Sequence, residues 1–210
     1  MNQFITLEGL DFSGKSTALN RIKDQLPQGT IFTREPGGTP KSEQIRKVLT
    51  TTSQQLTGLE KLNLFFDARY DHVEKVIDPN IKAGHLVISD RYVGSTYAYQ
   101  VAGDKLSFDI VDQKAKDLFN KFPTSKPDLT IYFQISSDIR KQRIGLRSQD
   151  DLDKYNEDFY KRVEKEYLKG INASAKQVII LDANGAPEET ANKLLNIILD
   201  FTKDTEHGSN

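Results

Sequence analysis

The 210-residue sequence contains no cysteine and no tryptophan, and it has only three histidines and one methionine. Without cysteine the chain can form no disulfide, can use no thiolate as a nucleophile and can offer no sulfur ligand to zinc. The histidines His72, His85 and His207 are far apart in the sequence, which argues against a histidine-based metal site.

Long apolar runs and an excess of one charge are also missing. No apolar stretch approaches the ~18 residues of a membrane span, and the N-terminus does not have the pattern of a signal peptide. The net charge is -1 and the sequence pI ≈ 6.3, whereas nucleic-acid-binding domains are usually strongly basic. We therefore expect a cytoplasmic protein that binds neither nucleic acid nor membrane.

The chain alternates predicted strands and helices, and its length fits a single domain over residues 1–210. Strands are predicted at 3–8, 30–33, 85–89, 129–135 and 177–181. Helices are predicted at 17–26, 42–49, 59–83 (bent or interrupted at Pro79), 92–101, 107–122, 154–169 and 187–201. The tail at 202–210 is polar and expected to fray. This order predicts an α/β fold with a five-stranded parallel sheet flanked by helices.

The segment from Gly9 to Thr17 fits the P-loop pattern G-x-x-x-x-G-K-[ST] and lies between a predicted strand and a predicted helix. Glycines let backbone N–H groups surround a phosphate, and the helix N-terminus adds partial positive charge. Lys15 would reach the β- and γ-phosphates, and the Ser16 hydroxyl would bind Mg²⁺. The predicted nucleotide-binding residues are Gly9, Leu10, Asp11, Phe12, Ser13, Gly14, Lys15, Ser16 and Thr17.

Basic residues follow four of the five predicted strands. Lys15 in the P-loop follows the first strand, and Arg34 and Arg91 follow the second and third. Arg140, Lys141, Arg143 and Arg147 come after the fourth. Ligands of open parallel sheets bind beyond the carboxyl ends of the strands. Loops are commonly polar, but this repetition favours a ligand with several phosphates.

Arg69 interrupts the core-facing stripe of the predicted helix 59–83, which consists of Leu62, Phe66, Val73 and Val76. A buried guanidinium is costly unless it is paired or meets a ligand. Phe65 lies four residues earlier, so that the pair could stack on a base and hydrogen-bond its carbonyl group. The sequence equally allows a structural carboxylate for Arg69 and a core position for Phe65.

Two more segments allow two interpretations. Tyr92, Thr96, Tyr99 and Gln100 share one face of the predicted helix 92–101 and could read a base edge or pack into the core. The polar segment at about 136–153 fits either a solvated surface or a lid that closes over phosphates.

The order of several motifs resembles bacterial thymidylate kinase over nearly the whole chain. The motifs are EGLDFSGKST, FTREPGGT, FFDAR, ISDRYVGSTYAYQ, PDLTIYF and LDKYN. The resemblance implies a P-loop nucleoside monophosphate kinase fold with a lid, and transfer of the ATP γ-phosphate to dTMP. It also implies Mg²⁺ as cofactor and a homodimer.

Roles near the phosphates follow from the matching motifs. By resemblance, the P-loop holds ATP, and Asp11 contacts the dTMP 3′-hydroxyl and, in some members, Mg²⁺. Arg91 would hold the dTMP phosphate with Arg34 nearby.

The resemblance also resolves the open cases around the base. Phe65 would stack on thymine and Arg69 would bond its carbonyl group. Thr96 and Gln100 would read the pyrimidine edge, and Tyr99 would exclude a ribose 2′-hydroxyl.

The sequence departs from many family members at two positions. Phe12 stands where some members have a P-loop arginine, so the transition-state cation is expected from the lid, with Arg147 as first choice and Arg143 as second. Lys154 stands where many members have arginine, and lysine lacks the bidentate fork.

Two other functions stay open at this stage. One is another P-loop deoxynucleotide or deoxynucleoside kinase. The other is a P-loop switch GTPase, which would need a base-reading N-K-x-D motif. The nearest string, Asn120-Lys121-Phe122-Pro123, lacks the aspartate.

Overall fold

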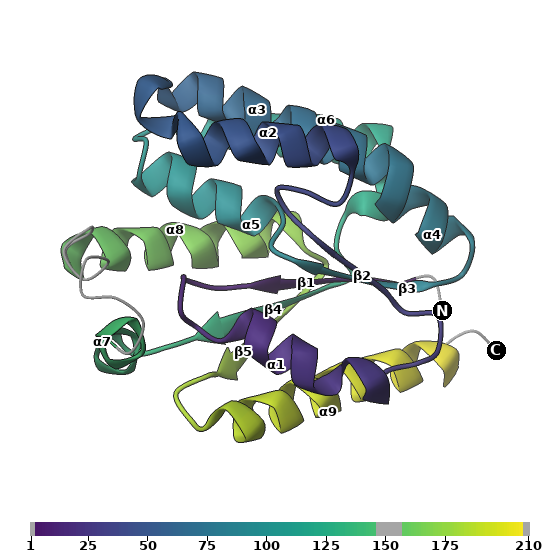
Figure 1. Ribbon diagram of the computed structural model, residues 1–210. Helices are drawn as coiled ribbons and strands as arrows, with labels where there is room; N and C mark the ends of the chain where they lie inside the picture. The colour runs from purple at the N-terminus through teal and green to yellow at the C-terminus, as the bar shows by residue number, and fades with distance from the viewer. Residues whose placement is uncertain (1–2, 146–156, 208–210) are drawn as a thin grey trace.

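Five parallel strands form one sheet in the computed structural model, which describes residues 3–145 and 157–207 (Figure 1). The strand order β2-β3-β1-β4-β5 places β1 at the centre. The strands are β1 (Gln3–Glu8), β2 (Ile31–Arg34), β3 (Leu86–Asp90), β4 (Leu129–Gln134) and β5 (Gln177–Asp182). The α/β fold and the five-stranded parallel sheet predicted from the sequence are confirmed.

Helices cover both faces of the sheet (Figure 1). One face carries α1 (Lys15–Ile22) and α9 (Pro187–His207), which pack against each other. The other carries α3 (Gly58–His72), α4 (Asp78–Lys82), α5 (Val93–Thr96), α6 (Phe108–Lys121) and α8 (Glu157–Ser174). Helix α2 (Pro40–Thr51) packs on α3, and α7 (Ser137–Gly145) follows β4. Among the described helices, none is long and apolar enough to cross a bilayer.

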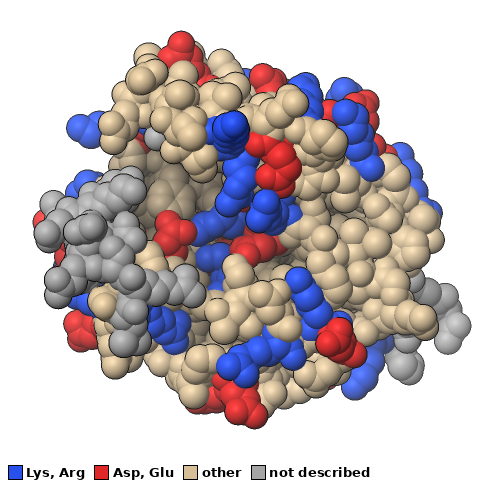
Figure 2. Space-filling model, viewed as in Figure 1, with Lys and Arg blue, Asp and Glu red and all other residues tan. Residues whose placement is uncertain are grey.

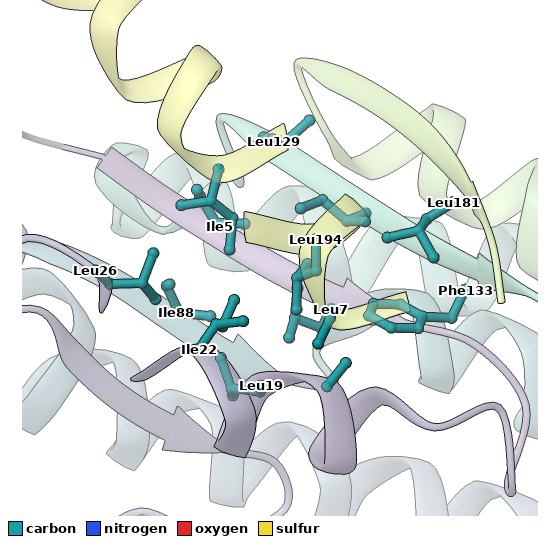
Figure 3. Packing of buried hydrophobic residues seen from close by; sticks show 14 of the residues in the cluster. Ile5, Leu7, Leu19, Ile22, Leu26, Ile88, Leu129, Phe133, Leu181 and Leu194 are labelled. Atoms are coloured by element: carbon teal, nitrogen blue, oxygen red, sulfur yellow. The ribbon is translucent and has the colours of Figure 1, made fainter. Parts of the chain in front are cut away.

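Alternating side chains of the central strands supply the core. Ile5 and Leu7 point toward α1 and α9, where they pack with Ile22 and Leu194 (Figure 3). Phe4, the residue before Ile5, belongs to the cluster on the opposite face. This period of two fixes β1 between both helical layers and leaves its carboxyl end at the P-loop.

The helix predicted at 59–83 is irregular before Pro79 rather than at it. A π turn, Val73–Ile77, separates α3 from α4, and Pro79 lies in the first turn of α4. Proline lacks an N–H and crowds the carbonyl four residues earlier, and a wider turn accommodates both effects. The extra residue shifts the buried stripe from the predicted Val76, which is half-buried, to Ile77, which is fully buried.

Several predicted boundaries were wrong. The polar segment after β4 begins as helix α7, and α9 extends through the predicted frayed tail to His207. Helix α1 begins at Lys15 rather than at residue 17, because the P-loop ends directly in the helix. The helix predicted at 92–101 is confirmed from Val93 to Val101, but its second half, Tyr97–Val101, is a π turn.

Replacing Ile198 by Ala should lower the free energy of unfolding by about 2–5 kcal/mol, because a fully buried side chain leaves a cavity between α9 and the sheet. Ile180→Ala is the matched control, since Ile180 is 52% exposed, and should cost less than about 1 kcal/mol. Urea denaturation measures both values. Equal losses in the two variants would contradict the assigned core.

Candidate active site

The P-loop makes a tight turn between β1 and α1. Gly9 and Gly14 have φ values of 146° and 93°, and Phe12 has a φ of 67°. A Cβ atom at Gly9 would lie 2.8 Å from the carbonyl oxygen of Phe133. Glycine is therefore required at the start of the loop, where the backbone passes against β4.

Lys15 is buried inside this loop. Its Nζ donates to the carbonyl oxygens of Gly9 (2.9 Å) and Leu10 (3.0 Å) and to Ser13 Oγ (3.2 Å). Burial, reinforced by the nearby Arg91, lowers the pKa of Lys15 to about 7, although neighbouring carboxylates oppose this change. An arriving phosphate would supply negative charge that favours the protonated amine.

A cavity of about 770 Å³ opens beyond the carboxyl ends of the strands, and it is lined by the P-loop from Asp11 to Thr17. Figure 2 shows Lys and Arg side chains around a hollow on this face, with acidic side chains among them. Four arginines line the cavity, namely Arg34, Arg46, Arg91 and Arg143. The sequence predicted three of them from their positions after strands. Arg46 was missed because it lies on α2.

Arg91 is held by four hydrogen bonds. Its backbone has a left-handed φ of 71°. Its NH1 group donates to Tyr167 Oη (2.7 Å), Ser95 Oγ (2.9 Å) and the carbonyl oxygen of Gly9 (3.2 Å), and its NH2 group donates to Asp11 Oδ1 (2.5 Å). The guanidinium is thereby fixed beside the P-loop.

Glu8 lies behind Arg91 and was not predicted as a site residue. Its fully buried carboxylate accepts hydrogen bonds from the N–H groups of Tyr92 (2.9 Å) and Ser95 (3.1 Å), and from Ser95 Oγ (2.7 Å) and Tyr167 Oη (3.2 Å). Burial raises the pKa of Glu8, although the Ser95 hydroxyl and Arg91 act in the opposite direction. The only signal for this role in the sequence was a glutamate at the end of the first predicted strand.

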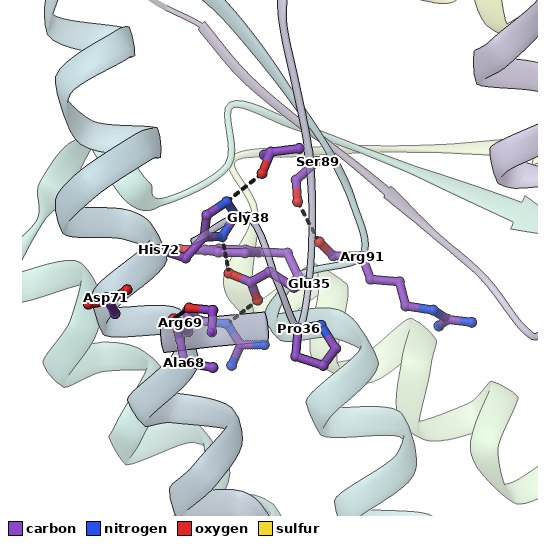
Figure 4. Close-up of polar contacts among 12 residues, drawn as sticks. Glu35, Pro36, Gly38, Ala68, Arg69, Asp71, His72, Ser89 and Arg91 are labelled. Atoms are coloured by element: carbon purple, nitrogen blue, oxygen red, sulfur yellow. Dashed lines mark hydrogen bonds and ion pairs between the residues drawn. The ribbon is translucent and has the colours of Figure 1, made fainter. Parts of the chain in front are cut away.

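A second polar cluster surrounds Arg69. Its Nε donates to Glu35 Oε2 (2.7 Å) and its NH2 group donates to Thr96 Oγ1 (3.0 Å). Glu35 Oε1 lies 3.0 Å from His72 Nδ1, and His72 Nε2 lies 2.6 Å from Thr33 Oγ1. Figure 4 shows Glu35 between His72 and Arg69, while the Arg91 side chain points away from this cluster.

The structural carboxylate considered for Arg69 is therefore present, but one donor of this residue stays unpaired. The NH1 group of Arg69 is buried and has no hydrogen-bond partner within the described residues. An unpaired buried donor is costly, which favours a ligand acceptor at this position.

The other predicted base-reading residues are distributed around the two clusters. Thr96 and Gln100 are buried, and the hydroxyl of Tyr99 donates to Asp11 Oδ2 over 3.4 Å. Phe65 is half-buried, and the rings that lie against the Arg69 guanidinium belong to Phe66 (4.9 Å) and Tyr92 (5.2 Å). None of the five predicted base-reading residues (Phe65, Arg69, Thr96, Tyr99 and Gln100) is among those that line the 770 Å³ cavity.

Arg143 packs against the back of the P-loop. It donates to the carbonyl oxygens of Phe12 (3.3 Å), Ser13 (3.1 Å), Ala183 (2.7 Å) and Gly185 (3.1 Å). Arg147 and Lys154 lie outside the described residues.

Two further basic residues predicted at the rim lie elsewhere. Arg140 is buried with its guanidinium 3.2 Å from the ring centre of Tyr160, and Lys141 pairs with Glu157 over 3.4 Å. Neither Arg140 nor Lys141 lines the phosphate cavity.

The oxygen ligands near the P-loop fit Mg²⁺. Ser16 Oγ donates to Asp90 Oδ2 over 2.6 Å, and Asp11 lines the same cavity. The described residues contain no cluster of three or more His, Cys, Asp or Glu that could hold a metal by itself. Mg²⁺ typically uses one or two carboxylates together with substrate phosphates, so this set is sufficient.

Residues 7–194 match the family model described as thymidylate kinase. The chain belongs to the thymidylate kinase family. It is therefore a phosphotransferase, and the resemblance stated from the motifs is confirmed.

Curated relatives and a solved structure agree with this family. Thymidylate kinase of Mesoplasma florum is 36% identical over 205 residues, which cover 94% of this chain and 95% of the relative. That of Mycoplasma capricolum is 34% identical and covers 97% of each chain. The crystal structure of thymidylate kinase from Ehrlichia chaffeensis matches with a TM-score of 0.71 at 27% identity, covering 94% of this chain and 98% of that one.

The Asp11–Arg91 pair predicts a pH dependence of stability. Removing the Asp11 carboxylate from water raises its pKa, but Arg91 and Lys15 outweigh this and leave the pKa below its ordinary value of 3.8. Ionised Asp11 therefore stabilises the fold above that value, and the contribution disappears as the pH falls through the lowered pKa. The difference in Tm between wild type and Asp11→Asn should shrink as the pH falls below about 4. Thermal unfolding measured across this pH range tests the prediction. A Tm difference that widens in acid would contradict the Asp11–Arg91 pairing.

Proposed function

We propose that the protein transfers the γ-phosphate of ATP to dTMP, forming dTDP and ADP for dTTP synthesis. The observation that carries this proposal is the position of Glu35. Glu35 lines the phosphate cavity and also accepts the hydrogen bond from Arg69 Nε. A monophosphate with its phosphate at Arg91 and its base at Arg69 would thus lie beside the P-loop, which is where a kinase acceptor must lie.

The donor side is built from the P-loop. The nine residues from Gly9 to Thr17 hold the ATP phosphates, and Lys15 exchanges its bonds to loop oxygens for bonds to the β- and γ-phosphates. Ser16, with Asp11 and Asp90 nearby, would hold Mg²⁺. When bound, the metal neutralises charge on the transferring phosphate.

The acceptor side uses the two clusters described above. Arg91 holds the dTMP phosphate and Arg34 lies on the same cavity wall. The unpaired NH1 group of Arg69 donates to a thymine carbonyl. Phe65 stacks on the base, and the remaining base-edge and sugar contacts come from Thr96, Gln100 and Tyr99.

The transition state of phosphoryl transfer requires positive charge around the equatorial oxygens. Lys15 supplies one charge. A lid arginine supplies another, with Arg147 as first choice, since Arg143 already donates to four carbonyl oxygens.

We also propose that the protein acts as a cytoplasmic homodimer in which each subunit is a single P-loop kinase domain. Exposed apolar side chains on α2, α3 and α6 support a dimer surface there, namely Val48 (41%), Leu59 (49%) and Ile110 (44%). Light scattering after gel filtration should give twice the monomer mass of 23.8 kDa. A monomer mass at micromolar concentration would contradict the proposed dimer.

An acceptor panel tests the function. ADP formation from Mg²⁺·ATP should be far faster with dTMP than with dUMP, UMP, dCMP, dGMP or thymidine. Lys15→Ala is the control and should lower turnover by a factor of about 10³ or more, with an unchanged circular dichroism spectrum.

The other outcomes identify the alternatives. Preference for another acceptor would indicate a different P-loop kinase and overturn the base pocket. Hydrolysis without an acceptor, with GTP preferred over ATP, would indicate a switch protein.

A further inference from the structure

We propose that Tyr167 is a positioning residue for Arg91, and that its hydroxyl holds the guanidinium in the orientation that receives the acceptor phosphate. This inference rests on the proposed function, which assigns that phosphate to Arg91. Tyr167 lies on α8, 76 residues away from Arg91 in the sequence, and its Oη is 2.7 Å from Arg91 NH1.

The contacts of Arg91 use NH1 and one N–H of NH2, which leaves Nε and the second N–H of NH2 for a ligand. NH1 faces Tyr167, Ser95 and the Gly9 carbonyl, and NH2 donates to Asp11. Among the described residues, no acceptor pairs with Nε. The Nε–NH2 edge is the fork that can donate two parallel hydrogen bonds to a phosphate. Holding NH1 in place therefore orients the Nε–NH2 edge toward the acceptor phosphate.

Ring packing fixes the position of the Tyr167 hydroxyl. The Tyr167 side chain is completely buried, and its ring lies 6.0 Å from the ring of Tyr99 and 5.4 Å from that of Tyr132. A buried hydroxyl must be hydrogen-bonded to avoid a large cost. Here the ring fixes where the oxygen lies, and the polar partners fix how it is oriented.

Three acceptors surround the Tyr167 hydroxyl. Ser95 Oγ lies 2.7 Å from Oη, and Glu8 Oε2 and the Gly9 carbonyl oxygen each lie 3.2 Å from it. Donation of the single hydroxyl hydrogen to any of them leaves a lone pair of the oxygen for Arg91 NH1. Glu8 itself is held by the backbone N–H groups of Tyr92 and Ser95. The chain of contacts thus runs from the end of β1 through Tyr167 to Arg91.

Tyr132 offers a matched control. It belongs to the same buried cluster as Tyr167, and within the described residues it has no hydrogen bond to Arg91. If Tyr167 only filled space, Tyr167→Phe and Tyr132→Phe should behave alike. If the hydroxyl positions Arg91, only Tyr167→Phe should weaken binding of the phosphate group.

The experiment compares dTMP with thymidine, which lacks the phosphate. Tyr167→Phe should raise the calorimetric Kd and the KM for dTMP about tenfold, which is typical for losing a hydrogen bond to a charged group. The thymidine Kd, the KM for ATP and the Tm should stay close to wild type. Tyr132→Phe should leave every one of these values unchanged.

An unchanged dTMP affinity in Tyr167→Phe, or equal losses for dTMP and thymidine, would overturn the inference.

Should this variant fail to fold, Glu8→Gln provides the second test. Its amide can donate to Tyr167 Oη and take the lone pair from Arg91, so dTMP binding should weaken while thymidine binding does not. Failure of the proposed function is distinguishable, because wild-type protein would then not phosphorylate dTMP.

Discussion

The carbonyl oxygen of Gly9 is the point on which the site depends. It accepts hydrogen bonds from Lys15 Nζ and Arg91 NH1, and Tyr167 Oη lies 3.2 Å from it. Two cations and a phenol from three separate elements converge on this oxygen because β1 ends there, and only glycine fits beside the carbonyl of Phe133. Buried cations must be satisfied when no phosphate is present, and this backbone oxygen supplies part of the hydrogen bonding that they require.

Fixed geometry follows from this arrangement. Carboxylates offset the cations, with Asp11 on Arg91 and Glu35 on Arg69, and the NH1 group of Arg69 stays without a partner among the described residues. Donors fixed before the substrate arrives need little reorganisation during phosphoryl transfer. The two arginines lie in separate clusters that Glu35 and the P-loop connect, so one substrate can be held at both its phosphate and its base.

The sheet, the P-loop and three cavity arginines were predictable from the sequence because each depends on local pattern. Alternating apolar residues specify strands, and Arg34, Arg91 and Arg143 follow strand ends. Glu8, Arg46 and Tyr167 were not predicted, because their roles arise only when distant segments meet. Likewise, a π turn moved Ile77 into the stripe in place of Val76, which a regular helical period cannot indicate.

Arg91→Lys tests most directly whether a fixed guanidinium fork, rather than positive charge alone, organises the site. Lysine keeps the charge but cannot bind Tyr167, Ser95, Asp11 and a phosphate together. The measurement is kcat/KM for dTMP at saturating ATP, with the KM for ATP measured in parallel. We expect a loss of at least about tenfold in kcat/KM for dTMP, with the KM for ATP unchanged. Activity close to wild type would contradict the central role given to the Arg91 geometry.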